Sequence, residues 1–369
     1  MTTSGADEAT RVALAWSRIP GLSLRRFWKL HETAGGWRAL IGADPAPLVP
    51  AARSEAVARA ATRPFAVDVT GDLEQARRAG VSILNPFEGP YPPLLREITD
   101  PPLVLYAAGD LGRLMLPAVG IVGARSATHY GREVCAEIAG HLSQAGVCVV
   151  SGMARGIDAA AHAAALGNPG GTIAVLGSGV DLSYPKENTA LWERIGREGL
   201  LLSEYPPGTA PLPAYFPVRN RIIAGMASGV VVVEAAQRSG SLITARLAND
   251  FGRDVFAVPG SVRSESSQGC HALLRDGAIL CRGAEDVLTE LFPSIVGAAA
   301  GGAAPALDED AARIVTAMSG EDAWDADDLA EVTRIPIGTL LAMLFDLESR
   351  GVLRCLPGGL YAVRRDGRA

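Results

Sequence analysis

Basic side chains and small residues meet in several short segments that could hold phosphate groups. Gly123 and Arg125 lie in the segment Gly120–Gly131, which begins in an apolar run. A turn of small residues after a parallel strand lets backbone N–H groups and a helix N-terminus face an anion. The planar guanidinium group of an arginine suits phosphate oxygens. The alternative role for Arg125 is a surface salt bridge.

Two further segments have a similar composition. Ser151 and Gly152 follow an apolar run that ends at Val150, and Lys186 lies in a glycine-rich segment. Lys186 is one of only two lysines in a chain that otherwise uses arginine as its basic residue. A compact ammonium group in a glycine-rich loop is suited to holding a phosphate. Chance alone could also place a lysine there.

A fourth segment places two guanidinium groups near a predicted helix start. Arg219, Asn220 and Arg221 follow Pro217, and proline favours the first turn of a helix. Anions are favoured at that end of a helix because of its dipole. These side chains would therefore contact phosphates, or else hold the preceding loop in place. The sequence favours neither role over the other.

Acidic and histidine side chains raise the alternative of catalysis. Asp158 and His162 are one helical turn apart, and Glu234 precedes the small-residue helix start Ser239–Ser241. The sequence places no third metal ligand near Asp158, and an aspartate at a helix start commonly faces the helix dipole. We find no nucleophile–base–orienter set and no Walker loop. An enzyme acting on a nucleotide or nucleoside phosphate, with Glu234 as acid or base, stays as the alternative function.

The segments that position these residues alternate apolar runs with helical patterns over residues 80–290. This alternation predicts an α/β fold with a Rossmann-like, doubly wound, mostly parallel sheet. Uninterrupted apolar runs suit strands that are buried on both faces. The predicted strands are Ala118–Val122, Cys148–Val150, Thr172–Leu176, Leu200–Ser203, Val230–Val233, Val255–Val258 and Ala278–Leu280. Helices are predicted at Gly131–Ala145 and Leu242–Phe251, and an extended lead-in at Tyr91–Leu95 and Asp100–Tyr106.

Smaller domains are predicted on both sides of this core. Residues 1–70 indicate short helices that form a SAM-like or helix-hairpin-helix domain, or else a plain helical bundle packed on its neighbour. We place the Rossmann-like core at residues 71–292. A Gly/Ala-rich linker follows at residues 293–307. Residues 308–369 have the order of helices and a hairpin that is typical of a winged-helix domain.

Composition excludes several classes of protein. Of 369 residues, 48% are hydrophobic and 20% are charged, which indicates a packed globular chain of two or three domains. The N-terminus lacks the pattern of a secretory signal, and no apolar run is long enough for a membrane helix. The five cysteines form no CxxC pair and are expected to be reduced and buried. We therefore expect a cytoplasmic protein.

The net charge of −6 is unevenly distributed. Residues 111–292 hold 15 basic and 16 acidic side chains, whereas residues 308–369 hold 7 and 12. A nearly neutral domain can still present a basic patch to phosphates. A regulator that reads duplex DNA through the winged helix is a further alternative, but Gly338–Arg350 offers little basic or amide chemistry for base edges. We expect that domain to serve protein contacts or dimer control.

An ordered series of motifs resembles a known family. VGAR, SGMARGID, LGSGVD, YPKEN, SEYPPG, FPVRNRIIAG, SGSLITA, VPG and QGCHALLRDGA together resemble the DNA-processing protein A (DprA/Smf) family over most of residues 80–290. The resemblance implies a core that binds single-stranded DNA without strong sequence preference and forms a homodimer. It also implies help in loading the recombinase RecA onto incoming strands during natural transformation. No cofactor, metal or enzymatic activity is expected.

The resemblance also implies which residues contact the DNA. Arg125 and Lys186 would be the most important phosphate contacts. The same groove would be lined by Gly123, Ser151, Gly152 and Arg219 or Arg221. Tyr184 or Phe216 could stack on bases, which contributes about 1–3 kcal/mol per base. Binding of this kind should weaken as salt rises.

Overall fold

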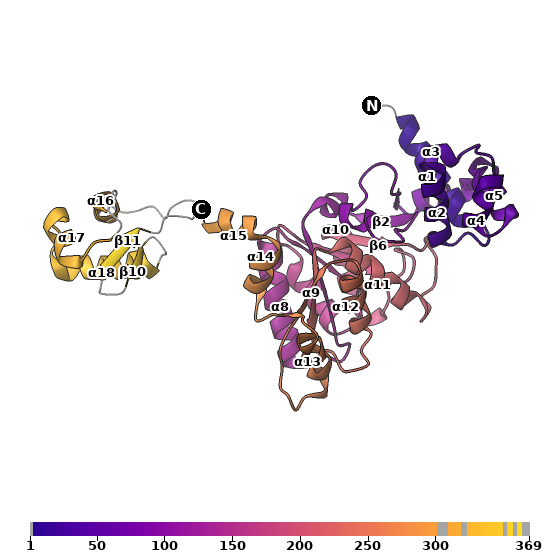
Figure 1. Cartoon of the computed structure of the whole chain (residues 1–369). Helices are drawn as coiled ribbons and strands as arrows, with labels where there is room; N and C mark the ends of the chain where they lie inside the picture. Colours follow the sequence, from indigo (N-terminus) through magenta and orange to yellow (C-terminus); the bar gives the residue numbers. More distant parts are fainter. Residues whose placement is uncertain (1–2, 301–308, 319–322, 350–352, 357–359, 364–369) are drawn as a thin grey trace. The chain divides into compact units, whose positions relative to one another are not determined.

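The computed structural model describes residues 3–300, 309–318, 323–349, 353–356 and 360–363 (Figure 1). The chain divides into two compact units, Met1–Pro293 and Ser294–Ala369, and each is considered by itself. The first unit contains a nine-stranded sheet in the order β1-β2-β6-β5-β4-β3-β7-β8-β9. Strands β3 to β9 run parallel to one another, whereas β2 is antiparallel to both of its neighbours. The predicted Rossmann-like fold is confirmed.

All seven predicted strands are present, each within one residue of its predicted ends. Uninterrupted apolar runs lead to strands such as β5 and β7, in which every residue is buried. The strands are β1 (Ser82–Leu84), β2 (Leu105–Gly109), β3 (Ala118–Gly123), β4 (Cys148–Ser151), β5 (Thr172–Leu176), β6 (Leu200–Ser203), β7 (Gly229–Val233), β8 (Asp254–Ala257) and β9 (Ile279–Leu280).

Helices cover the sheet, and most of them connect its parallel strands. They are α7 (Pro93–Arg96), η3 (Leu111–Met115), α8 (His129–Gln144), α9 (Ile157–Ala165), η4 (Lys186–Asn188), α10 (Thr189–Glu198), α11 (Tyr215–Met226), α12 (Ser241–Asp250), η5 (Glu265–Ser267), α13 (Gln268–Arg275) and α14 (Ala284–Leu291). Both predicted helices are found, as α8 and α12. The extended lead-in predicted at Tyr91–Leu95 is wrong, because Pro93 opens the short helix α7. Proline is compatible with a first helical turn because the N–H that it lacks has no partner there.

The N-terminal part of the first unit is a cluster of short helices. They are α1 (Thr3–Arg18), α2 (Leu24–Ala34), α3 (Trp37–Leu40), η1 (Ala46–Leu48), α4 (Val49–Ala52), α5 (Glu55–Ala61), η2 (Pro64–Ala66) and α6 (Thr70–Arg78). Trp16 is fully buried, and its Nε1 donates to the carbonyl of Ala61 at 2.8 Å. The core around Trp16 is continuous with apolar residues of the sheet, including Leu176. The domain boundary at residue 70 stays a prediction.

The second unit has the order of a winged helix. Its elements are α16 (Glu309–Ala317), α17 (Ala326–Thr333), α18 (Ile337–Ser349), β10 (Leu353–Leu356) and β11 (Leu360–Val363). Ile314, Leu329 and Leu340 are fully buried in its own core. Helix α15 (Pro293–Ala300) begins in the segment predicted as a linker. The rest of that linker and the turn between β10 and β11 lie outside the described residues.

A buried histidine inside the sheet unit has hydrogen-bond partners on both ring nitrogens. His162 on α9 is fully buried, and its Nδ1 lies 2.7 Å from Thr172 Oγ1. Thr172 Oγ1 donates to the carbonyl of Val149, so the ring donates through Nδ1 and its Nε2 accepts from Met153 N at 3.3 Å. Burial, and then the charge of Arg219, lower the pKa of His162 from 6.5 to about 3. His162 is therefore a neutral group that joins α9 to the sheet.

This lowered pKa predicts a loss of stability in acid. At pH 7 the ring is neutral in both states, but below pH 6.5 the unfolded chain binds a proton that the folded chain cannot bind until about pH 3. The free energy of unfolding should therefore lose about 2 kcal/mol from this group between pH 7 and pH 5. Urea unfolding of wild type and His162→Gln at both pH values measures this difference. Buried Asp158 and Glu204 have raised pKa values, which change stability in the opposite direction. Both groups are present in wild type and in the variant, so their contributions cancel in the comparison.

The matched control for this experiment is His129→Gln, because the side chain of His129 is 81% exposed. That variant should show the same pH dependence as wild type. An equal dependence in His162→Gln would mean that His162 protonates freely in the folded chain.

Two expectations from composition bear on the described residues. Cys135, Cys148, Cys270 and Cys281 are free and buried, as predicted for these four. In the part of the chain that the structure describes, no helix has both the length and the apolar character that crossing a membrane requires.

Candidate functional site

The sheet reverses its direction of winding between β3 and β7. The chain proceeds from β3 through β4 and β5 to β6, and then returns through α11 to place β7 on the other side of β3. In open α/β sheets, ligands bind outside the carboxyl ends of the strands at such a point. Arg125 follows the carboxyl end of β3, so it lies at this switch point.

Three predicted residues form an arginine–aromatic cluster near this point. The guanidinium carbon of Arg125 lies 5.9 Å from the centroid of the Phe216 ring, and Phe216 lies 5.4 Å from the ring of Tyr184. Arg125 comes from the β3–α8 loop, Tyr184 from the β5–α10 loop, and Phe216 from the first turn of α11. Arg125 and Tyr184 are exposed, and Phe216 is half-buried. In such a cluster the cation can bind a phosphate while the rings stack on bases.

The loops that carry the cluster are joined by hydrogen bonds. Asn188 Nδ2 donates to the carbonyl of Met153 at 3.0 Å, which ties the β5–α10 loop to the β4–α9 loop. The backbone N–H of Ile157 donates to the carbonyl of Ala124, which ties the β4–α9 loop to the β3–α8 loop. Exposed Lys186 lies two residues after Tyr184, in this joined set. The candidate site is therefore one connected surface.

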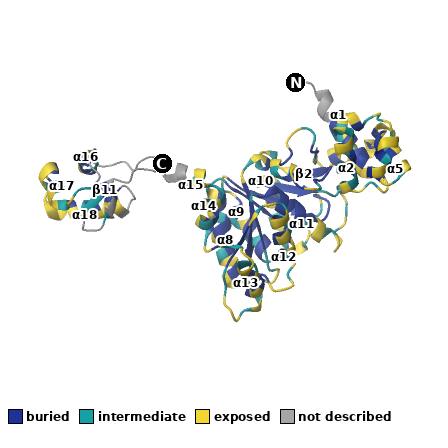
Figure 2. Ribbon diagram, in the orientation of Figure 1, coloured by how far each residue is buried: buried dark blue, intermediate teal, exposed yellow. Residues whose placement is uncertain are grey.

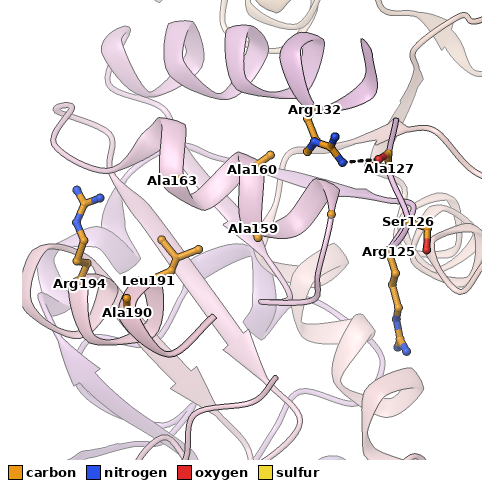
Figure 3. Close-up of a pocket in the computed structure, with 11 residues that line it drawn as sticks. Arg125, Ser126, Ala127, Arg132, Ala159, Ala160, Ala163, Ala190, Leu191 and Arg194 are labelled. Atoms are coloured by element: carbon orange, nitrogen blue, oxygen red, sulfur yellow. Dashed lines mark hydrogen bonds between the residues drawn. The ribbon is translucent and has the colours of Figure 1, made fainter. Parts of the chain in front are cut away.

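A hollow of about 520 Å³ continues from this surface across α9. Figure 3 shows Arg132 near the start of α8 and Arg194 on α10 on either side of the alanines of α9, and Arg125 on the β3–α8 loop with its side chain directed away from these alanines. Arg132 Nη1 donates to the carbonyl of Ala127 at 2.5 Å, and Arg194 pairs with Glu198 at 3.3 Å. Basic groups therefore border the hollow, and its floor is made of the small side chains Ala159, Ala160 and Ala163.

Ser151, Gly152 and Arg219 lie beneath the surface. Ser151 is fully buried, and its Oγ donates to the carbonyl of Ile121 at 2.6 Å. Arg219 is also buried and donates to the carbonyl of Val175. A Cβ atom on Gly152 would overlap the Arg219 guanidinium group, so the glycine makes room for it. In this structure the side chains of Ser151 and Arg219 bind the protein rather than face solvent.

Buried charges accompany Arg219. Burial lowers the pKa of Arg219 to about 10, against the opposing charge of Asp158. Burial also raises the pKa of Asp158, and the charge of Arg219 opposes that rise. Asp158 Oδ2 accepts from the backbone N–H of Ala154 at 3.3 Å. Asp158 and His162 therefore have separate partners, and the predicted structural role fits both.

Arg221 holds a neighbouring loop. Its Nη2 lies 2.6 Å from both carboxylate oxygens of Glu204, and the side chain of Arg221 is 9% exposed. Burial raises the pKa of Glu204, although Arg221 opposes the rise. This pair joins α11 to the segment after β6. A phosphate contact by Arg219 or Arg221 stays a prediction.

Glu234 accepts hydrogen bonds from the residue that caps α8. Its carboxylate accepts from the backbone N–H of Thr128 at 2.8 Å and from Thr128 Oγ1 at 2.5 Å. Thr128 in turn caps α8 by accepting from Gly131 N. Glu234 follows β7 with φ of 53°, a left-handed conformation that is uncommon for residues other than glycine. Its role in the structure is to join β7 to the β3–α8 loop.

Sequence reasoning missed three exposed basic residues at or beside the site, which are Arg132, Arg155 and Arg194. Arg155 lies in the β4–α9 loop and forms an ion pair with Glu187 at 3.6 Å, with 61% of its side chain exposed. Arg155 follows a strand in a glycine-containing loop, as Arg125 does, and that similarity could have identified it. Among the described residues, no group of three or more His, Cys, Asp or Glu side chains could hold a metal ion.

Comparison with known proteins assigns the chain to a family. Residues 82–292 match the family described as DNA recombination-mediator protein A. The chain belongs to this family. Residues 298–359 match a second description, the DprA winged helix domain.

Relatives of the DNA recombination-mediator protein A family match much of the chain. DNA processing protein DprA of Streptococcus pneumoniae is 50% identical over 200 residues, which are 54% of this chain and 71% of that protein. Protein Smf of Synechocystis is 38% identical over 338 residues, which are 79% of this chain and 82% of that protein. The resemblance found in the motifs is confirmed.

Solved structures of family members have the same fold. The X-ray structure of DNA processing protein A from Streptococcus pneumoniae has a TM-score of 0.66 and 38% identity, covering 77% of this chain and 96% of that chain. DNA processing protein A from Helicobacter pylori, reported for its single-stranded DNA binding mode, has a TM-score of 0.53 and 31% identity. It covers 58% of this chain and 96% of that one.

Proposed function

We propose that this protein binds single-stranded DNA along the surface that contains Arg125, Lys186, Tyr184 and Phe216. The observation that carries the proposal is the cluster of Arg125 with Phe216 and Tyr184 at the switch point of the sheet. The guanidinium group would bind a phosphate, and the rings would stack on bases of any sequence. The family description and the binding mode reported for the Helicobacter pylori relative support this function.

The strand would be held by its backbone, with its bases largely unread. Arg125, Lys186 and Arg155 are exposed basic groups on the joined loops, and Gly123 lies at the end of β3. Arg132 and Arg194 border the hollow next to Arg125 and would extend the basic surface. Because phosphate contacts release counterions, the affinity should fall as salt rises, with a log–log slope of about −0.7 per phosphate neutralised.

The role of the bound strand in recombination is the finer part of the proposal. The protein would help load RecA onto strands that enter the cytoplasm during natural transformation, and it would act as a homodimer through the sheet unit. It would do so without enzymatic activity. The hydrogen bonds from Thr128 to Glu234 support this, because they give the candidate acid or base of the alternative nucleotide enzyme a structural role at the start of α8.

Titration of labelled oligo-dT at two salt concentrations, with an equally long duplex as competitor, tests the binding function. We expect tight, salt-sensitive binding that the duplex does not displace. Equal preference for the duplex would contradict the proposed single-strand binding.

RecA filament formation on DNA coated with a single-strand-binding protein, with and without this protein, tests the loading step. Sedimentation tests the dimer.

Replacement of both aromatic residues should weaken this binding. Because Tyr184 and Phe216 each offer a ring to one base, the double variant Tyr184→Ala/Phe216→Ala should lose roughly tenfold or more in affinity for oligo-dT. Its salt dependence should not change, since no phosphate contact is removed. Fluorescence anisotropy measures both quantities. Unchanged affinity in the double variant would rule out stacking on these rings.

A further inference from the structure

The second unit buries only one side of helix α18. Leu340, Leu344 and Leu347 are at most 1% exposed and belong to the core of this unit. Their spacing of three and four residues places them on one face of the helix. The winged-helix core is therefore completed by that face, and the neighbouring face of α18 is not needed for it.

The face beside it carries large apolar side chains. Ile337, Leu341 and Phe345 are spaced four residues apart and are 43%, 45% and 73% exposed. Val332 on the preceding helix α17 is 57% exposed. Figure 2 shows exposed residues along these two helices. Apolar side chains that gather on one face, in contrast to scattered ones, mark an interaction site.

The two helices that carry these exposed apolar side chains are acidic. From Ala326 to Ser349 the chain has five acidic residues and one basic residue, Arg334. The acidic residues are all exposed and are Asp327, Asp328, Glu331, Asp346 and Glu348. In winged-helix and helix-turn-helix proteins that read DNA, the second helix enters the major groove and contacts base edges. In this protein α18 is the corresponding helix. It would bring negative charge and apolar side chains to the phosphates, which disfavours DNA as the ligand of α18.

We propose that α17 and α18 form a docking surface for an amphipathic helix of a partner protein. The partner helix would place apolar residues against Ile337, Leu341 and Phe345, and Lys or Arg residues against the acidic border. Because the exposed charges on α17 and α18 are mainly acidic, the complementary partner is basic. A second copy of this chain is a poor fit, because a twofold contact would place the acidic borders against each other. The proposal does not depend on DNA binding by the first unit.

Binding of a designed peptide to the full-length chain tests the proposal. The probe is a labelled helical peptide of leucine and lysine with its leucines on one face, and the comparison peptide has glutamate in place of lysine. We expect the leucine–lysine peptide to bind wild type and to bind Phe345→Ala about tenfold more weakly or worse. Glu331→Lys should also weaken it. The matched control is Phe65→Ala in the first unit, because Phe65 is 60% exposed and should not contribute.

Several results would overturn the proposal. These are no binding to wild type, equal binding to wild type and Phe345→Ala, or equal binding of the two peptides. Self-association of wild type that Phe345→Ala abolishes would assign the surface to a second copy instead. Oligo-dT binding by Phe345→Ala should match that of wild type, so a failure of this proposal is distinguishable from a failure of DNA binding.

Discussion

Replacement of Arg125 by alanine should weaken oligo-dT binding by roughly 10- to 100-fold. A hydrogen bond between two charged groups contributes about 1.5–3 kcal/mol, and a tenfold change in affinity is about 1.4 kcal/mol. The log–log salt slope should become shallower by about 0.7 if one phosphate contact is lost. Lys186→Ala should act in the same direction. Stability should change little, because both side chains are exposed.

Matched controls exist for both variants. Arg197 is an exposed arginine in the last turn of α10, and it belongs neither to the arginine–aromatic cluster nor to the lining of the hollow. Lys29 is the other lysine of the chain. Arg197→Ala and Lys29→Ala should bind oligo-dT as wild type does. If Arg197→Ala lost as much affinity as Arg125→Ala, binding would follow overall charge rather than this site.

Replacement of Gly123 by alanine should destabilise the sheet unit by about 1–3 kcal/mol or more. A Cβ atom at Gly123 would overlap the backbone carbonyl of Val233 and the side chain of Ile157. A backbone carbonyl within a parallel sheet cannot move aside without disturbing the pairing of β3 with β7. The resulting shift would also displace Arg125, so oligo-dT binding should fall with stability. Urea unfolding and anisotropy measure the two effects.

Gly140→Ala is the matched control for the glycine variant. Gly140 lies within α8, and the nearest atom to its added Cβ would be 3.8 Å away, which is an ordinary contact. Because alanine is the better helix former, this variant should gain up to about 1 kcal/mol. A Gly123→Ala protein as stable as wild type would show that β3 and β7 can separate locally at no cost.

The parallel sheet could be predicted from sequence because its strands are buried on both faces. Apolar runs such as Thr172–Leu176 mark such strands without ambiguity, and β5 has these bounds. The antiparallel edge of the sheet, formed by β1 and β2, was harder to predict from sequence. Strand β1 is only three residues long, with one exposed and one buried end, so its sequence carries little pattern. The segment after Tyr91 contains consecutive prolines, which are compatible with both extended chain and a helix start.

The exposed part of the candidate site could also be predicted. Arg125, Tyr184 and Lys186 follow the carboxyl ends of β3 and β5, where doubly wound folds bind ligands. Their proximity to Phe216 required the structure, because it depends on how α11 returns across the sheet to β7.

The burial of Arg219 and Arg221 could not be read from sequence. Arginine is rarely buried without a partner, and both partners are distant along the chain: the Val175 carbonyl for Arg219 and the Glu204 carboxylate for Arg221. Sequence periodicity also fails on α11, since seven of its residues are buried and they surround the helix. Glu234 was ambiguous for the same reason, because Thr128 is 106 residues away from it.

The hydrogen bonds from Asn188 to Met153 and from Ile157 to Ala124 fix the loops of the candidate site before any ligand arrives. A binding surface that is already in shape loses little conformational entropy on association. A free single strand is flexible and must give up much of its own freedom to follow that surface. With the proposed function, the entropy of ordering would therefore fall on the nucleic acid, and the protein would act as a rigid template onto which a disordered strand is laid out.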